Sequence, residues 1–163
     1  MIASLTGTVA AVGLDHAVVD VGGVGLSCIA TPTTLAGLRV GERAHLATTL
    51  VVREDSLTLF GFRDDDERAT FLTLQTVTGI GPRLALAVLA VLTPDDLRRA
   101  IAGEDLNVLQ RVPGIGRKVA QRLVLELAGK LGAPSGESPA AAPAALDEEV
   151  VAALTALGWP VRD

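Results

Sequence analysis

The sequence predicts a small β barrel of the OB type, followed by an all-α domain built on a repeated motif. Residues 1–62 contain five short segments in which β-branched and apolar residues alternate with polar ones. Residues 65–131 show apolar residues at helical spacing, and one glycine-containing pattern occurs twice within them. Ala, Pro, Ser and Gly dominate residues 133–145, which predicts a flexible linker before a short C-terminal helical segment.

Five short strands in about sixty residues are typical of a Greek-key barrel. A short helical turn is expected over residues 31–38. The pair Gly22-Gly23 is interpreted as a hairpin turn, because no Lys-Ser/Thr pair and no helix follow it to form a phosphate loop. The expected strands cover residues 5–12, 17–21, 25–30, 44–52 and 57–62.

The helical part begins with a run of acids at residues 64–67, which we interpret as a cap and first turn rather than as metal ligands. Residues 93–96, Thr-Pro-Asp-Asp, are a clear helix start. After the linker, residues 146–157 place their apolar positions on one helix face. The other expected helices cover residues 65–76, 82–91, 94–102, 104–111 and 117–131.

The repeated pattern is Gly-Ile-Gly followed by cationic residues, and its copies begin at Gly79 and Gly114, 35 residues apart. Each copy lies between two helical patterns, so each predicts a helix, a hairpin and a helix. Glycines permit positive φ and close approach of a ligand, while the N–H groups of the hairpin and of the next helix favour an anion. The isoleucines are expected to point inward. Each copy taken singly is explained as well by a glycine-capped turn.

Two copies with cations in the first helical turn, where the helix dipole disfavours positive charge, instead indicate binding of a sugar-phosphate backbone. The charge distribution agrees with this interpretation. The whole chain has a net charge of −5, but residues 68–131 hold nine Lys and Arg against five acids, a net charge of +4. The residues predicted to bind the DNA backbone are Thr78, Gly79, Ile80, Gly81, Arg83, Gly114, Ile115, Gly116, Arg117, Lys118 and Arg122.

Composition argues against several other classes of protein. Cys28 is the only cysteine, so an intramolecular disulfide and an iron–sulfur cluster are excluded and a cytoplasmic location is expected. His16 and His45 lie near no plausible ligand set, so we expect no metal and no cofactor. The longest apolar run, residues 84–92, is too short to cross a bilayer, so no membrane partner is expected.

Taken in order, these features resemble the RuvA family, whose members bind Holliday junctions within the bacterial branch-migration machine. The resemblance covers essentially the whole chain. It is carried by the turn at residues 21–25, by Val-Val-Arg-Glu-Asp at residues 51–55 with Leu-Phe-Gly-Phe at residues 59–62, and by both hairpins. The combination of paired hairpins with the Arg-Glu-Asp turn is highly specific.

The resemblance implies a homotetramer that holds an open four-way junction, with one or two tetramers on the DNA and without selection of DNA sequence. Glu54 and Asp55, which locally suggest only a polar turn, would form an acidic pin near the junction centre. The implied domains are an oligomerising barrel at 1–63, a DNA-binding domain at 64–132, a linker at 133–145, and the start of a motor-binding module at 146–163.

The implied partners are the ATP-driven motor RuvB and, as a further candidate, the resolvase RuvC, in recombination and DNA repair. The motor contact would involve Val150, Leu154 and Leu157. Because the family's C-terminal module usually continues beyond the point where this sequence ends, at Asp163, we expect an incomplete module. No catalytic site is expected in the chain itself, and no ATP-binding motif occurs.

The alternative function is that of a helix-hairpin-helix DNA repair enzyme. A glycosylase of this type would carry a catalytic Asp beside its second hairpin, but the next Asp after that hairpin is Asp147, beyond the linker. A nuclease could use Asp64, Asp65 and Asp66 as metal ligands. A scaffold that does not touch DNA would leave the basic repeat unexplained.

Overall fold

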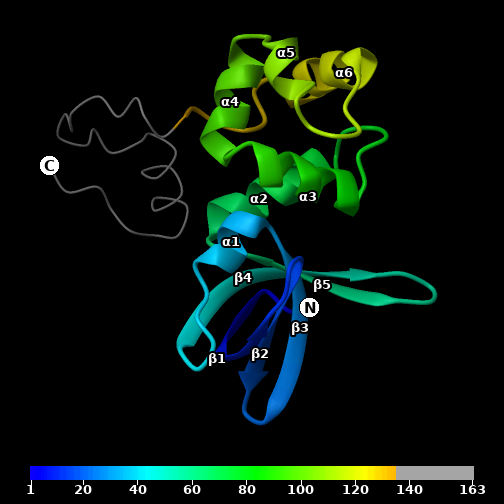
Figure 1. Cartoon of the computed structure of the whole chain (residues 1–163). Coiled ribbons are helices and arrows are strands. Elements are labelled where there is room, and N and C mark those ends of the chain that lie inside the picture. The colour runs from blue at the N-terminus through cyan, green and yellow to red at the C-terminus, as the bar shows by residue number, and fades with distance from the viewer. Residues whose placement is uncertain (135–163) are drawn as a thin grey trace, which may run out of the picture.

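The computed structural model describes residues 1–134. Figure 1 shows a β barrel with a layer of helices stacked on one end of it. The predicted linker and the predicted C-terminal helix, with Val150, Leu154 and Leu157, lie outside the described residues.

The barrel is closed, with strand order β1-β2-β3-β5-β4. Neighbouring strands are antiparallel except β3 and β5, which are parallel. The predicted barrel with a short helix after the third strand is therefore confirmed. Its elements are β1 (Ser4–Val12), β2 (His16–Val21), β3 (Val24–Ala30), α1 (Pro32–Ala36), β4 (Arg43–Val52) and β5 (Leu57–Phe62).

The alternation seen in the sequence places one face of each strand inside the barrel. Leu5, Val19, Cys28, Leu46 and Leu59 form a buried cluster there. Burial in this apolar interior raises the pKa of the Cys28 thiol, so this cysteine packs as a small apolar residue.

The predicted hairpin turn between β2 and β3 is also confirmed. Gly22 and Gly23 adopt φ of +63° and +90°, and the Gly23 N–H donates to the Asp20 carboxylate at 2.8 Å. A turn whose two central residues both have positive φ matches the right-handed twist of the strands that it joins.

Three helices are shorter than predicted. They are α2 (Asp65–Leu74), α5 (Leu106–Leu109) and α6 (Arg117–Leu127), whereas α3 (Pro82–Val91) and α4 (Pro94–Ala102) match the expected ranges. Helix α5 starts late because Glu104 adopts φ of +51° and the Asp105 side chain caps the Val108 N–H instead. After α6, Gly129 adopts φ of +77°, a conformation that ends a helix.

The acids at residues 64–67 form the cap and first turn of α2, as predicted. Asp64 accepts the Glu67 N–H at 2.8 Å. Asp66 forms an ion pair with the buried Arg98 of α4, and the hydrogen bond that Arg98 donates to Asp66 is the main cause that raises the pKa of that arginine. Asp65 pairs with Arg68 at 3.1 Å. All three aspartates thus stabilise the helical layer.

A buried carboxylate connects the helical layer to the barrel. Glu67, 5% exposed, accepts hydrogen bonds from the Thr31 and Thr34 hydroxyls at 3.2 and 3.1 Å and from the Arg63 N–H at 2.8 Å. Arg68 adds a second connection, because its guanidinium donates to the Ala3 carbonyl of the barrel at 3.0 Å.

Aromatic packing also joins the helical layer to the barrel. The Phe71 ring of α2 lies 5.1 Å from the Phe60 ring and 4.8 Å from the Phe62 ring, both on β5. These residues belong to one hydrophobic cluster that continues into every helix from α2 to α6. The barrel and the helical layer therefore share a core, and this shared core fixes where the two hairpins are presented.

Candidate nucleic-acid interface

The two Gly-Ile-Gly segments form hairpins of the same conformation. We call residues 77–81 hairpin 1 and residues 112–116 hairpin 2. Gly79 and Gly114 adopt φ of +87° and +91°. In each hairpin the isoleucine N–H closes the turn, Ile80 on the Val77 carbonyl and Ile115 on the Val112 carbonyl, both at 3.0 Å.

Both isoleucine side chains point inward, as predicted. Ile80 and Ile115 are each 5% exposed and belong to the shared core. Because their N–H groups close the turns and their side chains are buried, these residues hold the hairpins in shape.

The second glycine of each hairpin has no explanation within the fold. Gly81 and Gly116 adopt φ of −94° and −88° with extended ψ, which any residue can adopt. A Cβ added at either position would meet nothing within 4 Å. Both are N-cap residues without a side-chain cap, although Ser, Thr, Asn or Asp would stabilise a helix there. Bare backbone at both points therefore favours close approach by an external partner.

The predicted cations lie at these same helix starts. Arg83, Arg117 and Lys118 are exposed in the first turns of α3 and α6. Within residues 1–134 none of the three forms an ion pair. The first turns of these two helices also contain no acid. Two fully uncompensated basic helix starts are electrostatically unfavourable by themselves and would be stabilised by an anion.

The two copies differ in the number of groups that they can offer to an anion. Pro82 occupies the first helical position after hairpin 1, where hairpin 2 has Arg117. Proline supplies neither a charge nor an N–H. Hairpin 2 therefore offers one more donor and one more cation to an anion than hairpin 1.

Each hairpin is also braced by the helix of the other copy. Arg122 of α6 donates to the Thr78 carbonyl at 2.9 Å, and Glu126 accepts the Thr78 N–H at 3.1 Å. On the other side, a Cβ at Gly114 would come within 3.2 Å of the Leu84 side chain of α3. Thr78 thus has both backbone groups engaged inside the protein, and Arg122 has a bracing contact besides any contact with DNA.

The Glu54-Asp55 turn lies at the tip of the β4–β5 hairpin. Val52 pairs with Leu57, and the Arg53 N–H donates to the Ser56 carbonyl at 2.8 Å, so Glu54 and Asp55 are the outermost residues of the turn. Both are exposed and form no ion pair with any residue that the structure describes. Two neighbouring uncompensated carboxylates project there.

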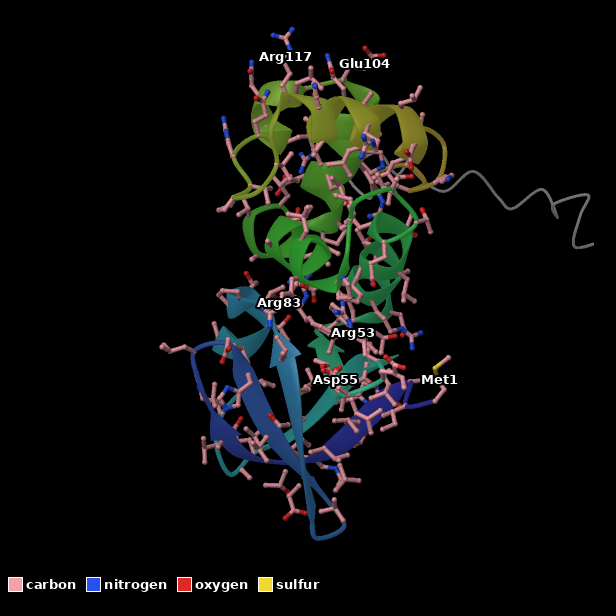
Figure 2. All side chains as sticks on the ribbon, turned by 90° about the vertical axis from the view of Figure 1, so that its right-hand side faces the viewer. Met1, Arg53, Asp55, Arg83, Glu104 and Arg117 are labelled. Carbon is pink, nitrogen blue, oxygen red and sulfur yellow. The ribbon has the colours of Figure 1, made fainter. Side chains whose placement is uncertain are left out.

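The predicted groups lie on one side of the molecule. In Figure 1 the loops that join α2 to α3 and α5 to α6 lie on the same side as the β4–β5 hairpin. Figure 2 shows Arg117 at the end of the helical layer farthest from the barrel, and Arg83 close to the barrel. Arg53 and Asp55 lie near the boundary between the barrel and the helical layer.

The sequence interpretation gave no role to three residues that the structure makes prominent. From the sequence, Arg53 is only part of the Arg-Glu-Asp turn, Glu67 is only one of the acids of a first helical turn, and Glu126 has no assigned role. Only Arg53 had a usable signal, namely a cation beside two acids on a turn. The two threonine partners of Glu67 and the Thr78 partner of Glu126 are 33 to 48 residues away in the chain, so no local pattern reveals them.

The described residues offer no site of two other kinds. Among residues 1–134, no group of three or more His, Cys, Asp or Glu is placed to hold a metal ion. No helix in this part of the chain has the length and apolar character needed to cross a membrane.

Comparisons with known proteins agree with this architecture. Residues 1–61 match the family described as RuvA N terminal domain, and residues 71–128 match the SAM-like helix-hairpin-helix tandem. The relatives below are all named Holliday junction branch migration complex subunit RuvA. That of Beutenbergia cavernae is 65% identical over 164 residues, which cover 99% of this chain and 82% of the relative. That of Thermobifida fusca is 61% identical over 170 residues, covering 100% and 84%. That of Streptomyces coelicolor is 55% identical over 165 residues, covering 100% and 82%. At this identity over this length, the chain belongs to the RuvA family.

Proposed function

We propose that this protein binds four-way (Holliday) DNA junctions by their structure rather than their sequence, as the DNA-binding subunit of a branch-migration complex. The ATPase would reside in a partner, RuvB, and the chain itself would carry no catalytic site. The names of its relatives support the assignment to such a complex. The hairpins supply the chemistry that the assignment requires.

The observation that carries the proposal is the pair of second glycines, Gly81 and Gly116. Neither is required by backbone conformation or by space inside the protein. Each lies directly before a basic helix start whose first N–H groups have no partner in the helix. This arrangement suits a phosphodiester in contact with bare backbone, and it contacts no base edge.

The acidic pin, Glu54 and Asp55, carries negative charge, opposite in sign to the charge beside the hairpins. Like charges oppose association, so Glu54 and Asp55 cannot strengthen DNA binding by attraction. With screening over about 10 Å in 0.1 M salt, only phosphates close to the pin respond to it. In a tetramer assembled through the barrels, which we also propose, four pins would meet at the junction centre. There they would keep the arms unstacked and allow strands to exchange.

A repair enzyme is the weaker candidate. The three aspartates that a nuclease would need as metal ligands act instead as a helix cap and as ion-pair partners of Arg68 and Arg98. The relatives are named as branch-migration subunits, which does not favour a glycosylase.

The test is a titration of the protein against synthetic four-way junctions of unrelated sequence and against linear duplexes of matched composition. We expect similar affinities for all junctions and much weaker binding to duplex, with a matched loss on every junction for the Arg117→Ala/Lys118→Ala variant. Equal affinity for junction and duplex would refute the proposal.

Partners are tested separately. Size measurement by light scattering should give a tetramer, or two tetramers on one junction. Pull-down with purified RuvB or RuvC tests each protein contact directly. A monomer at micromolar concentration would exclude the fourfold arrangement of pins.

A further inference from the structure

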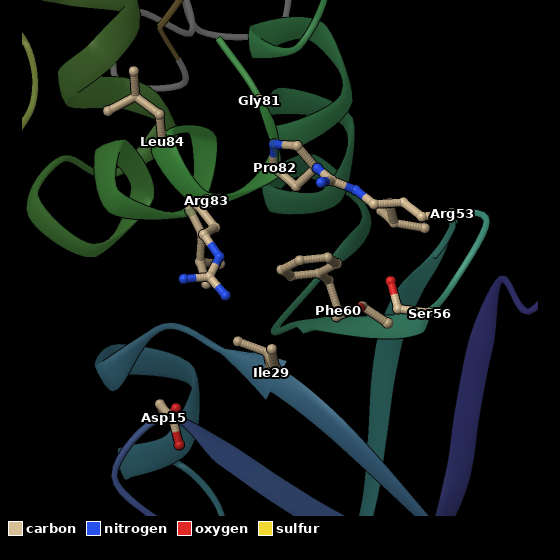
Figure 3. A pocket seen from close by; sticks show the side chains of 12 residues that line it. Asp15, Ile29, Arg53, Ser56, Phe60, Gly81, Pro82, Arg83 and Leu84 are labelled. Atoms are coloured by element: carbon tan, nitrogen blue, oxygen red, sulfur yellow. The ribbon is translucent and has the colours of Figure 1, made fainter.

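A cavity of about 600 Å³ lies between the barrel and the first turn of α3, and its lining reaches from Gly81 of hairpin 1 to Arg53 and Ser56 of the β4–β5 turn. Figure 3 shows this cavity with the side chains that line it. Its apolar surface comes from both parts of the molecule, including Ile29 and Phe60 from the barrel and Leu84 from α3. The shared core holds these walls at a fixed separation.

Two arginines from opposite walls line the cavity. Arg83 extends from α3 toward the barrel, and Arg53 extends from the end of β4 toward Pro82 (Figure 3). Neither forms an ion pair with a residue of the described part of the chain. Arg53 precedes two carboxylates in the sequence, yet it lines this cavity whereas Glu54 and Asp55 do not.

The remaining polar lining consists of one carboxylate and a few hydroxyls. The one carboxylate in the cavity, Asp15, is engaged by the His16 ring at 2.8 Å, a hydrogen bond that lowers the pKa of Asp15. Ser56 supplies a hydroxyl beside Arg53. Two guanidiniums that form no ion pair within the described residues therefore line one open space with an apolar floor (Figure 3).

We infer that this cavity is a third DNA-backbone site, in which Arg53 and Arg83 bind one phosphate of a strand that runs between the acidic pin and hairpin 1. The inference rests on the proposed function and adds to it a residue, Arg53, and a location. Planar guanidinium groups match phosphate oxygens in bidentate geometry. The apolar floor suits a deoxyribose.

The site gives the β4–β5 turn two opposite actions. The tip repels phosphates through Glu54 and Asp55, and the next residue back attracts one through Arg53. A strand leaving the junction centre is thereby directed away from the pin and toward hairpin 1.

The experiment tests whether Arg53 contacts the phosphate at one particular position of each strand. Four-way junctions are made with a neutral methylphosphonate at one position, the same in all four strands, and the position is moved outward from the crossover. The whole chain is titrated as wild type, Arg53→Ala and Arg43→Ala. Arg43 is the matched control because it is an exposed arginine at the other end of the same ten-residue strand, β4.

For wild type, one position near the crossover should weaken binding by at least tenfold, because one charge-assisted contact per subunit is lost and a single such contact is typically worth about tenfold. Arg53→Ala should weaken binding to the unmodified junction by a similar factor, and the methylphosphonate at that position should then cost nothing further. Arg43→Ala should retain the full effect of the methylphosphonate.

Two outcomes overturn different statements. If wild type prefers junction to duplex but Arg53→Ala behaves like Arg43→Ala at every position, the third site is wrong and the proposed function stands. If wild type shows no preference for junctions, the proposed function fails first. Thermal unfolding of each variant confirms that the exposed substitutions leave the fold intact.

Discussion

Replacing Gly116 with Ser should stabilise the protein and weaken its binding to DNA. Gly116 has the extended conformation of a helix N-cap, and an added Cβ meets nothing within 4 Å. A serine there can accept an N–H of the first turn of α6, which no side chain caps at present. The same hydroxyl and Cβ would occupy the surface that a phosphate approaches and would compete for its donor.

The two effects can be estimated separately. Serine is better than glycine at an N-cap by a few tenths of a kcal/mol, and loss of glycine freedom in the unfolded chain adds about 0.4–1 kcal/mol. For a protein of this size, 1 kcal/mol raises Tm by about 2–4 °C. Loss of one hydrogen bond to a charged phosphate costs about 1.5–3 kcal/mol, or roughly ten- to a hundredfold in Kd.

Two assays on the same preparation check this prediction: thermal unfolding at fixed protein concentration, and junction binding at fixed salt. The matched control is Gly114→Ala, two residues earlier. There φ is +91° and the new Cβ would lie 3.2 Å from Leu84, so stability should fall by about 1–2 kcal/mol or more. A Gly116→Ser protein that unfolds earlier than wild type would show that the second glycine serves the fold, and one that binds junctions equally well would show that DNA binding does not depend on it.

Three other changes test the remaining parts of the interface and the fold. Arg117→Ala or Lys118→Ala should reduce the slope of log affinity against log salt by about 0.9 for each lost phosphate contact, and an unchanged slope would show no such contact. Glu54→Gln with Asp55→Asn should keep or raise junction affinity and relax the preference for junction over duplex in gel shifts, whereas loss of junction binding by a folded tetramer would contradict repulsion. The hydrogen bond from Thr93 lowers the pKa of Asp96 in the capping box of α4, so its contribution is present above the unfolded pKa near 3.8 and disappears as pH falls through the lower folded value. Because Asp96 is partly exposed, Asp96→Asn should cost on the order of 0.5 kcal/mol near neutral pH, and its Tm should converge with that of wild type only as pH falls below 3.8 and through the lower folded pKa of Asp96.

Local patterns were sufficient to predict the barrel and the hairpins. The alternation of apolar and polar residues predicts the strands. The repeated glycines predict the hairpins, because Gly79 and Gly114 adopt positive φ and glycine is the residue that does so without steric cost. Helix ends were less accurate. The late start of α5 depends on Glu104 adopting a left-handed conformation, which its residue type does not indicate.

Long-range contacts were not predictable in this way. Glu67 reads locally as a first-turn acid, and only the packing of α2 on the barrel shows that its carboxylate is buried under two threonine hydroxyls. Arg122 reads as another cation for DNA, and only the packing of α6 beside hairpin 1 shows the bond to Thr78. The motor-binding residues and the domain roles stay predictions.

The hydrogen bonds of Thr78 to Arg122 and Glu126 hold the two hairpins at a fixed separation. Hairpin 1 cannot shift relative to α6, the helix that follows hairpin 2, without breaking these hydrogen bonds. If each hairpin binds one backbone of a duplex arm, the distance between the hairpins must match the width of the groove. The minor groove of B-DNA is about 6 Å wide, whereas that of an A-form RNA helix is wide and shallow. A rigid span set for one of these widths mismatches the other, so the hairpin pair would distinguish DNA arms from RNA arms by width alone, without contact to a 2′-hydroxyl.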